Sequence, residues 1–441
     1  MSKIKIELTS KALTNHTGLA FLSSYLNSSI INSKINKASN IKNKLLAISD
    51  TDIIKTILAL LCIGKTNFES VEQYRNNKYF KKILKIRKVP SCSTLRQRIE
   101  SYDSQMWSVL REINSELIQA NIFKESVEIK EQQYLIIDSD VTPMDNSGST
   151  KEGVEQTYKK VMGYAPMISY IGQSGFMLNN ELRSGSKHSN CPGTIEYFTQ
   201  TVELARSVSN SPLLMIMDSG NDDRKLVEIL NGLPSVEFLI KRNLRRESKD
   251  NYINECKEKA KAFGTIKELR KGSTIYYANW KIEVSDKTIP ISVVAHEKTH
   301  DRNGQALLIP EEDVEVYWNS LNLTAEETEA LYHSHGTSEQ YHSEFKSDMD
   351  MERLPSGKFQ ANYTFMLLGM LSFNLLRITG KMLLESGLVP KKHDKRTRLR
   401  LRTVIQNVIY MAGHYVEHSR QVIIRIFSFD PWALAFQSIM T

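Results

Sequence analysis

Three acidic side chains lie where carboxylates from separate parts of one chain could meet. Asp140 lies at the end of the apolar run Tyr134–Val141, and Asp218 follows the apolar run Leu213–Met217. Glu339 lies far downstream, in a stretch rich in aromatic, basic and acidic residues. Hard divalent cations such as Mg²⁺ bind oxygen ligands, and carboxylates in particular. Three converging carboxylates would therefore suit a site for a hard metal ion.

The stretch around Glu339 has a spacing that a helix turns into one face. Tyr332, His335, Glu339 and Lys346 stand at positions i, i+3, i+7 and i+14. In a helix they fall within about 60° of one another, so a phenol, an imidazole, a carboxylate and an ammonium would form one polar stripe. A lone stripe of this kind is more often a solvated helix face, and the two upstream aspartates favour a functional site instead.

Both aspartates follow segments with the composition of buried strands. Tyr134–Val141 is rich in apolar and β-branched residues, and Asp138 and Asp140 share one face of it by the two-residue period of a strand. Leu213–Met217 predicts a parallel strand that ends on Asp218, and α/β sheets place their chemistry at the carboxyl ends of such strands. For Asp218 alone, a helix-capping role is the common alternative.

Three motifs carry a resemblance to a known family. They are Asp140-Val-Thr142, Asp218-Ser-Gly220 and Tyr332-x2-His335-x3-Glu339-x6-Lys346. The chain resembles a DDE (Asp-Asp-Glu) transposase of bacterial insertion sequences, in the group whose Tyr-Arg-Glu-Lys signature has the same spacing. The Asp-x-Thr motif of that group favours Asp140 as the first carboxylate, with Asp138 as the alternative.

One position departs from the signature, because His335 stands where the family has arginine. An imidazole is smaller than a guanidinium and cannot make its forked, bidentate contact with a phosphate. It is charged only when protonated, so such a contact would depend on pH. The resemblance extends to Gly163–Pro166 and Arg398–Trp432, and it covers most of the chain.

The resemblance implies an enzyme that binds the ends of its own mobile element, cleaves the DNA and joins the ends to target DNA. It implies two Mg²⁺ ions about 4 Å apart, with Asp140 bridging them and Asp218 and Glu339 each holding one. Mn²⁺ is expected to substitute. The other three residues of the stripe are expected to contact the phosphates that flank the cut. The implied partners are double-stranded DNA, at the terminal inverted repeats and the target, and a second copy in a homodimer.

The elements between residues 131 and 246 predict an α/β fold. Their order is three strands in hairpins, a helix, a strand, a helix and a strand, with a hairpin turn at Gly172–Gly175. The resemblance names this order as a ribonuclease-H-like core, which a β-rich insertion interrupts. The predicted layout begins with a helical DNA-binding domain at 1–130. The core covers 131–246 and 326–390, with the catalytic glutamate in its second part, and the insertion at 247–325 has strands in Thr274–His300. A basic, helical C-terminal region covers 391–441, with a helix over Thr403–Arg420.

The N-terminal region leaves two interpretations open. Pro90–Thr94 ends one helical segment, and Leu95–Arg98 opens another with two arginines. A helix that begins with arginine after such a turn predicts a helix-turn-helix-like DNA reader. A helical bundle with a basic, solvated face explains the same residues equally well.

Two basic runs are candidates for phosphate contacts. Lys241–Arg246 directly follows a predicted core strand, and Lys391–Arg402 contains seven Lys or Arg residues. A solvated charge run is the default interpretation of such a sequence. The position of the first run beside the predicted site favours contact with DNA, and both runs are expected to line a DNA-binding surface. The candidate nucleic-acid-binding residues of the first run are Lys241, Arg242, Arg245 and Arg246.

The composition agrees with a DNA partner without requiring one. The 441 residues include 58 Lys and Arg against 50 Asp and Glu, a net charge of +8, which is a mild basic excess. Four scattered cysteines form no C-x-x-C pair, which argues against a zinc finger or a disulfide framework and fits a cytoplasmic, nucleoid-associated protein. The sequence begins without an apolar signal segment, and no uncharged apolar span is long enough to cross a membrane.

Two other functions stay open beside the transposase. A nuclease of the same fold would share all three carboxylates but would only hydrolyse DNA. A DNA-binding protein that has lost catalysis is the second alternative, and the intact carboxylates argue against it. A zinc site built from His333, His335 and His342 has little support, because their spacing is not that of a closed structural site and no cysteine is near.

Overall fold

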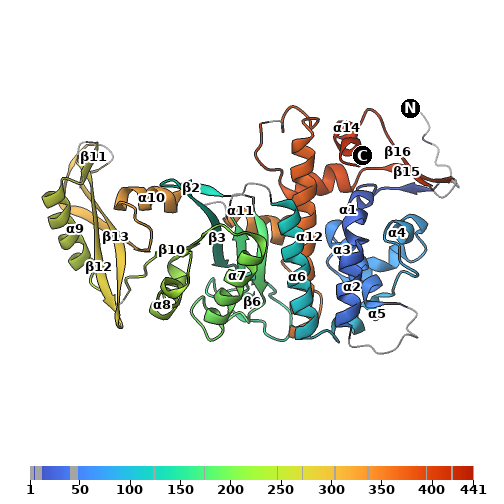
Figure 1. Ribbon diagram of the computed structural model, residues 1–441, viewed down its shortest axis with the longest axis horizontal. Helices are drawn as coiled ribbons and strands as arrows, with labels where there is room; N and C mark the ends of the chain where they lie inside the picture. The colour runs from blue at the N-terminus through green and yellow to red at the C-terminus, as the bar shows by residue number, and fades with distance from the viewer. Residues whose placement is uncertain are drawn as a thin grey trace.

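One mixed sheet of ten strands runs through the protein, with a helical region beyond one of its edges (Figure 1). The computed structural model describes residues 4, 12–39, 48–122, 126–172, 174–245, 247–270, 272–301, 304–334, 338–393, 395–418 and 421–440. Each of the three candidate carboxylates lies at the end of a strand of this sheet or on a helix beside it.

The central part of the sheet has the order predicted from the sequence. Strand β3 pairs antiparallel with β7, which pairs antiparallel with β8, while β9 is parallel to β3 and β10 is parallel to β9. In chain order these elements are β3 (Gln132–Val141), β7 (Met167–Ile171), β8 (Phe176–Glu181), α7 (Thr194–Val208), β9 (Leu213–Met217), α8 (Arg224–Gly232) and β10 (Val236–Lys241). The predicted succession of three strands, helix, strand, helix and strand is confirmed.

The β-rich segment after this core extends the same sheet. Strand β14 pairs antiparallel with β10, and β13, β12 and β11 follow outwards (Figure 1). The elements are α9 (Lys249–Phe263), β11 (Ile266–Arg270), β12 (Ser273–Val284), β13 (Lys287–His300) and β14 (Ala306–Asn319). The strands predicted within 274–300 are present, and backbone hydrogen bonds join them to the core through β14 and β10.

Side chains alternate between the two faces of the sheet, and this alternation decides where the aspartates point. Ile136 of β3 and Ile216 of β9 belong to one buried cluster, against which Tyr332 of α10 (Ala325–His333) packs. Strand residues two apart share a face. Asp140 therefore continues the face of Ile136, and Asp218 continues the face of Ile216. Both carboxylates project from the face that α10 covers.

The N-terminal helices pack around the long helix α12 (Phe359–Glu385) (Figure 1). By length and composition α12 is apolar enough to cross a membrane, but 83% of its most apolar window is buried inside the protein. Asn374 of α12 exchanges two hydrogen bonds of 2.8 Å with the backbone of Met177, which joins this helix to the edge strand β8. The helices of this region are α1 (Leu19–Leu26), α2 (Ser29–Ala38), α3 (Asp50–Cys62), α4 (Lys78–Ile83), α5 (Cys92–Ile99) and α6 (Ser104–Asn121).

The arginines of α5 are paired with acidic side chains. Arg98 has 12% of its side chain exposed and pairs with the buried Asp50. Arg96 forms an ion pair with Glu69 at 2.7 Å. For Arg98 the structure favours the bundle interpretation over a DNA-reading role. Several exposed basic side chains of this region lie on and just after α4, among them Lys78, Lys81, Lys82 and Lys85.

The C-terminal region contains a β-hairpin where the sequence predicts a helix. The prediction of a helix over Thr403–Arg420 is wrong beyond Ile409. Leu13, near the other end of the chain, pairs with His414 in a three-stranded sheet, and local periodicity contains no sign of that contact. The elements are β1 (Leu13–Thr14), α13 (Leu401–Val404), the π-helical segment η4 (Ile405–Ile409), β15 (Gly413–His418), β16 (Gln421–Ile426) and α14 (Ala433–Ser438).

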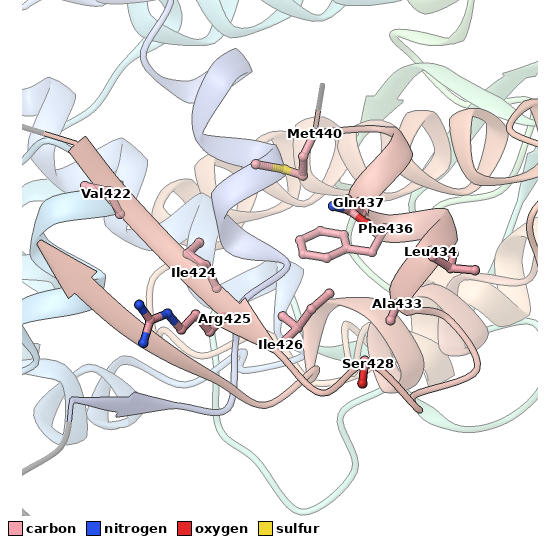
Figure 2. A pocket seen from close by; sticks show the side chains of 10 residues that line it. All are labelled: Val422, Ile424, Arg425, Ile426, Ser428, Ala433, Leu434, Phe436, Gln437 and Met440. Carbon is pink, nitrogen blue, oxygen red and sulfur yellow. The ribbon is translucent and has the colours of Figure 1, made fainter. Parts of the chain in front are cut away.

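Strand β16 and helix α14 enclose an apolar hollow of about 470 Å³ (Figure 2). Ile424 and Ile426 line it from the strand, and Phe436 and Met440 line it from the C-terminal end of the chain. This hollow lies beyond α12 from the strands that end on the aspartates (Figure 1). It is therefore separate from the candidate site described next.

Candidate active site

Asp140 and Asp218 lie level with one another at the carboxyl ends of neighbouring parallel strands. The last paired residues of β3 and β9 are Ser139 and Met217. Asp140 and Asp218 are the next residue along each strand, so their backbones are about one strand spacing, ~4.8 Å, apart. Because they also share a face of the sheet, their carboxylates converge as the sequence predicts.

Burial, followed by nearby negative charge, perturbs the first carboxyl group. Burial raises the pKa of Asp140 to about 7, and the negative charge of Asp218 adds to the rise. The backbone N–H of Val141, 2.6 Å from Oδ1, and the positive charge of Lys159 act in the opposite direction. A carboxyl group crowded in this way binds a proton unless a cation is nearby. Carboxylate oxygens gathered at one point fit a hard divalent cation such as Mg²⁺.

Asp218 serves two roles in the structure. Its Oδ1 accepts hydrogen bonds from the backbone N–H of Gly220 at 3.1 Å and from the side-chain amide of Asn221 at 2.9 Å. These bonds cap the short 3-10 turn η2 (Ser219–Asn221), so the capping alternative is correct. Burial nevertheless raises the pKa of Asp218. A cap alone does not require that the carboxyl group be placed level with Asp140.

Asp138 lies on the same face of β3, two residues before Asp140. It is 7% exposed, whereas 30% of the Asp140 side chain is exposed. A ligand shared by a metal ion and DNA must be accessible, so the structure favours Asp140 as the first carboxylate. The charge of Asp138 still acts on the site, because it raises the pKa of both Asp140 and Asp218.

The stretch Tyr332–Lys346 is not one regular helix. Helix α10 ends at His333, α11 covers Ser338–Ser343, and the π-helical segment η3 (Glu344–Asp348) follows. The prediction of a single polar stripe is therefore wrong as a geometry. His335 lies outside the described residues, so its phosphate contact stays a prediction.

Tyr332 and Lys241 lie at the same end of the sheet as the aspartates. The ring of Tyr332 is 5.0 Å from that of Tyr317 on β14, and the ammonium of Lys241 lies 5.8 Å from the Tyr332 ring. Burial and then the charge of Asp218 raise the pKa of Tyr332 well above its usual range. Lys241 also donates to Glu315 at 2.7 Å. A phenol and an ammonium therefore border the carboxylates.

Helix α11, which carries Glu339, lies beside the end of the Asp140 strand. On this helix His342 has its Nε2 3.8 Å from Oδ2 of Asp140. Glu339 lies three residues earlier, and residues three apart share a helix face. Glu339 is exposed, and no ion pair with another described residue holds its side chain. An unengaged carboxylate therefore lies on the helix face that meets Asp140.

A glycine turn provides the packing surface for α11. The hydroxyl of the buried Tyr341 donates to the backbone carbonyl of Gly172 at 3.1 Å. Gly175 has a φ of 66°, and a Cβ there would lie 2.5 Å from the Tyr341 ring. Only glycine meets both requirements without strain. The predicted hairpin turn at Gly172–Gly175 therefore also fixes the helix that carries Glu339.

The segment η3 presents one charge to the site and buries another. Lys346 donates to the backbone carbonyl of Pro143 at 3.0 Å, just after the Asp140 strand. Glu344 is completely buried, where it pairs with Arg377 at 3.1 Å and with Arg398. The buried pairs anchor η3 and so hold Lys346 beside the strand end.

The first basic run is only partly available to DNA. The Arg242 side chain is 2% exposed, pairs with Glu247 at 2.5 Å and stacks 4.4 Å over the Trp318 ring. The structure argues against the predicted contact of Arg242 with DNA, because its charge is buried and paired with Glu247. Arg245 is exposed and stays a candidate, while Arg246 lies outside the described residues.

The second basic run is tied to acidic side chains over its last part. Arg398 pairs with Glu344, and both Arg400 and Arg402 pair with the buried carboxylate of Asp348. These arginines connect the C-terminal region to η3. Their role in the structure is internal anchoring, which differs from the open DNA-binding run that the sequence predicts.

Two residues beside the site are not part of any of the three sequence motifs. Tyr158 and Lys159 lie on the turn between β5 (Glu155–Gln156) and β6 (Met162–Tyr164). The Tyr158 hydroxyl donates to the backbone carbonyl of Val141 at 3.4 Å, and 52% of this residue is exposed. Burial, together with the charges of the two aspartates, raises the pKa of Tyr158 to about 12. The adjacent aromatic and basic residues are the one local pattern that could have indicated this turn.

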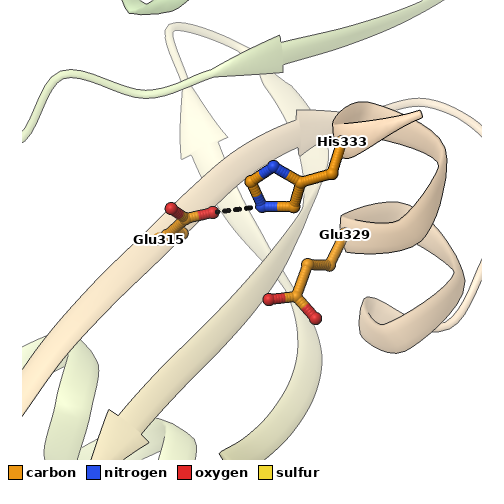
Figure 3. Close-up of side chains that lie close together, drawn as sticks. All are labelled: Glu315, Glu329 and His333. Atoms are coloured by element: carbon orange, nitrogen blue, oxygen red, sulfur yellow. Dashed lines mark ion pairs between the residues drawn. The ribbon is translucent and has the colours of Figure 1, made fainter. Parts of the chain in front are cut away.

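A second acidic group lies near α10 (Figure 3). Ligand atoms of Glu315, Glu329 and His333 lie within 4.8 Å of one another. His333 is 3.4 Å from Glu315, which also accepts from Lys241 at 2.7 Å. Glu329 accepts from the hydroxyl of Tyr277 at 3.1 Å. Because both carboxylates already have protein partners, we interpret this group as an ion-pair network that fixes α10 to β14.

Comparison with known proteins identifies the family of this chain. The family model described as "Transposase DDE domain group 1" matches residues 1–441. A search of curated proteins finds no match. Among solved structures the chain is similar to piggyBac transposase in a cryo-EM structure of the synaptic complex with hairpin DNA, with 12% identity, a TM-score of 0.44, and coverage of 91% of this chain and 82% of that chain. Because the family model spans every residue, the protein belongs to the DDE transposase family.

Proposed function

We propose that this transposase cleaves DNA at the ends of a mobile element and joins them to target DNA at a site formed by Asp140, Asp218 and Glu339. The observation that supports it most is the level position of the two aspartates on neighbouring parallel strands, with α11 beside them. Two crowded strand-end carboxylates and an unengaged carboxylate on the adjacent helix form the donor set that two-metal phosphoryl transfer uses.

Asp140, Asp218 and Glu339 would hold Mg²⁺, or Mn²⁺ in its place. When bound, the ions make the attacking water or 3′-hydroxyl reactive and stabilise the leaving oxygen. The neighbouring side chains act on the DNA itself. Lys346 supplies a point charge for a phosphate beside the cut, and Tyr332 supplies a hydrogen-bonding hydroxyl on the other side of the carboxylates.

The spacing of Tyr332, Glu339 and Lys346 supports the group of bacterial insertion sequences with the Tyr-Arg-Glu-Lys signature, with His335 in place of the arginine. The strand order of the core supports a ribonuclease-H-like fold for residues 131–246 and 326–390. We further infer that the protein acts in the cytoplasm on double-stranded terminal inverted repeats, as a homodimer that holds two ends.

The test is incubation of the protein with duplexes of its element's terminal repeats, a target plasmid and Mg²⁺, with the products resolved on a denaturing gel. The parent is expected to yield cleaved ends and joined product. Asp140→Asn, Asp218→Asn and Glu339→Gln are each expected to abolish both. The control is Glu283→Gln, which removes one charge from an exposed site on β12 and is expected to change neither.

Each alternative has its own outcome in this assay. Cleaved ends without joined product would identify a nuclease of the same fold. End binding without cleavage would identify a DNA-binding protein that has lost catalysis. Loss of cleavage in Asp138→Asn but not in Asp140→Asn would reverse the choice of the first carboxylate.

A further inference from the structure

His342 joins a tyrosine of the sheet to the first carboxylate. Its Nδ1 lies 3.4 Å from the hydroxyl of Tyr170 on β7, and its Nε2 lies 3.8 Å from Oδ2 of Asp140. The imidazole is 6% exposed. Its Nε2 is buried without a hydrogen-bond partner among the described residues. A buried, unpaired ring nitrogen is costly, so one aimed at a functional carboxylate needs an explanation.

The surroundings of the ring decide which nitrogen carries the proton. Burial disfavours the charged form of an imidazole, and this ring is only 6% exposed, so we take it as neutral with a single N–H. An ionised carboxylate can only accept, so the tautomer with its proton on Nε2 suits the Asp140 oxygen that Nε2 faces. In this tautomer Nδ1 accepts from the hydroxyl of Tyr170. The donor of the ring therefore points at Asp140.

We propose that His342 is a positioning residue, which donates its Nε2–H to Asp140 and thereby fixes the orientation in which this carboxylate binds a divalent cation. This inference rests on the proposed function of Asp140 as a metal ligand. The present distance of 3.8 Å exceeds a hydrogen bond, and a movement of about 1 Å by either side chain brings it to hydrogen-bonding length.

A neutral donor suits this task better than a positive charge would. A protonated histidine or a lysine would form an ion pair with Asp140 and compete with the cation for the carboxylate. A neutral imidazole orients one oxygen and leaves the negative charge available to the metal ion. Hydrogen-bond partners that orient metal-binding side chains in this way typically change metal affinity about 10–100-fold when removed.

The test measures Mn²⁺ binding to the full-length protein without DNA, through the electron paramagnetic resonance signal of free Mn²⁺. Two amides of different length separate the two ring nitrogens. His342→Gln places an amide N–H near the position of Nε2 and is expected to keep most of the affinity. His342→Asn reaches only the position of Nδ1 and is expected to weaken binding about 10–100-fold. Equal affinities for the two variants would overturn the proposal.

His342→Phe removes both nitrogens and is expected to bind Mn²⁺ as weakly as His342→Asn, with thermal unfolding as the check that each variant is folded. If His342→Phe does not fold, the comparison of His342→Gln with His342→Asn still tests the proposal. Asp140→Asn in the same assay separates this inference from the proposed function. Binding unchanged by Asp140→Asn would refute Asp140 as a ligand, and with it the basis of this role for His342. Binding lost in Asp140→Asn but unchanged in both His342→Asn and His342→Phe would refute the role of His342 alone.

Discussion

The guanidinium of Arg377 lies 3.1 Å from the carboxylate of Glu344, and at most 3% of either side chain is exposed. Arg398 pairs with the same carboxylate, so one buried acidic group is shared by two buried or half-buried guanidinium groups. These pairs connect α12 and the C-terminal region to the segment that carries Lys346. The position of the site therefore depends on an ion-pair cluster that does not belong to the site itself.

Glu344→Gln is expected to lower the free energy of unfolding by about 3–5 kcal/mol, because it leaves two arginines without a buried counter-charge. Urea unfolding followed by circular dichroism measures this loss. Glu339→Gln is the matched control, since it makes the same change on an exposed side chain of the preceding helix and is expected to leave stability nearly unchanged. Equal stabilities of the two variants would contradict the role of Glu344.

The second prediction concerns pH and Asp140. Its pKa rises from 3.8 to about 7 on folding, so the folded protein holds this proton more tightly than the unfolded chain. The associated stability is fully present below about pH 4 and is lost as the pH rises to about 7. Asp140→Asn cannot titrate, so between pH 4 and 7 it is expected to gain stability relative to the parent. Thermal unfolding of both proteins in EDTA across this range measures the difference.

A divalent cation is expected to reverse this difference in stability between the parent and Asp140→Asn above about pH 7. A ligand that binds only the folded state stabilises it, so excess Mg²⁺ at pH 8 is expected to raise the melting temperature of the parent more than that of Asp140→Asn. A parallel response of both proteins to pH and to Mg²⁺ would mean that the Asp140 carboxyl group is not crowded as the structure indicates.

The third prediction separates two neighbouring arginines. Arg245 is exposed, whereas Arg242 is buried against Trp318. Arg245→Ala is expected to reduce the slope of log affinity against log salt by about one unit if it removes one phosphate contact, with stability unchanged. Arg242→Ala is expected to destabilise the protein. The slope of log affinity against log salt, measured on the protein that remains folded, is expected to equal that of the parent. Fluorescence anisotropy with labelled end DNA at several salt concentrations tests both.

The fourth prediction concerns His335, which stands where the family signature has arginine. If it contacts a phosphate, only the protonated ring supplies charge, and its ordinary pKa is about 6.5. A nearby phosphate favours the charged form. DNA-end affinity is therefore expected to weaken as the pH rises through about 6.5 to 8, and His335→Arg is expected to weaken less. The DNA affinities of the parent and of His335→Arg are measured against pH at fixed salt, with Ca²⁺ to block cleavage. Parallel pH profiles would mean that His335 makes no such contact.

The elements of the core could be predicted because each one is encoded locally. The apolar run before Asp218 indicates a strand by composition alone, and the observed strand ends one residue before it. The strand register that sets Asp140 level with Asp218 is a property of pairing, which the run itself does not contain. The two strand-end positions predicted that the carboxylates would meet at one edge of the sheet, but not that they would be level.

What the sequence could not provide depends on distant partners. The burial of Arg242 requires Trp318 from another strand, so the basic run alone resembles an exposed one. The hairpin near the C-terminus pairs with Leu13 from the other end of the chain. In both cases a contact with a distant part of the chain outweighs the local pattern.

Continuous backbone hydrogen bonding from β11 to β3 sets the distance between these two strands along the sheet. Six strand spacings separate these two strands along the sheet, which at about 4.8 Å each amounts to about 29 Å. A duplex spans that distance in about nine base pairs, at about 3.4 Å per step. DNA that touched both β11 and Asp140 would therefore be cut at a fixed distance, about nine base pairs, from its contact with β11. That distance would not depend on the base sequence between the two contacts.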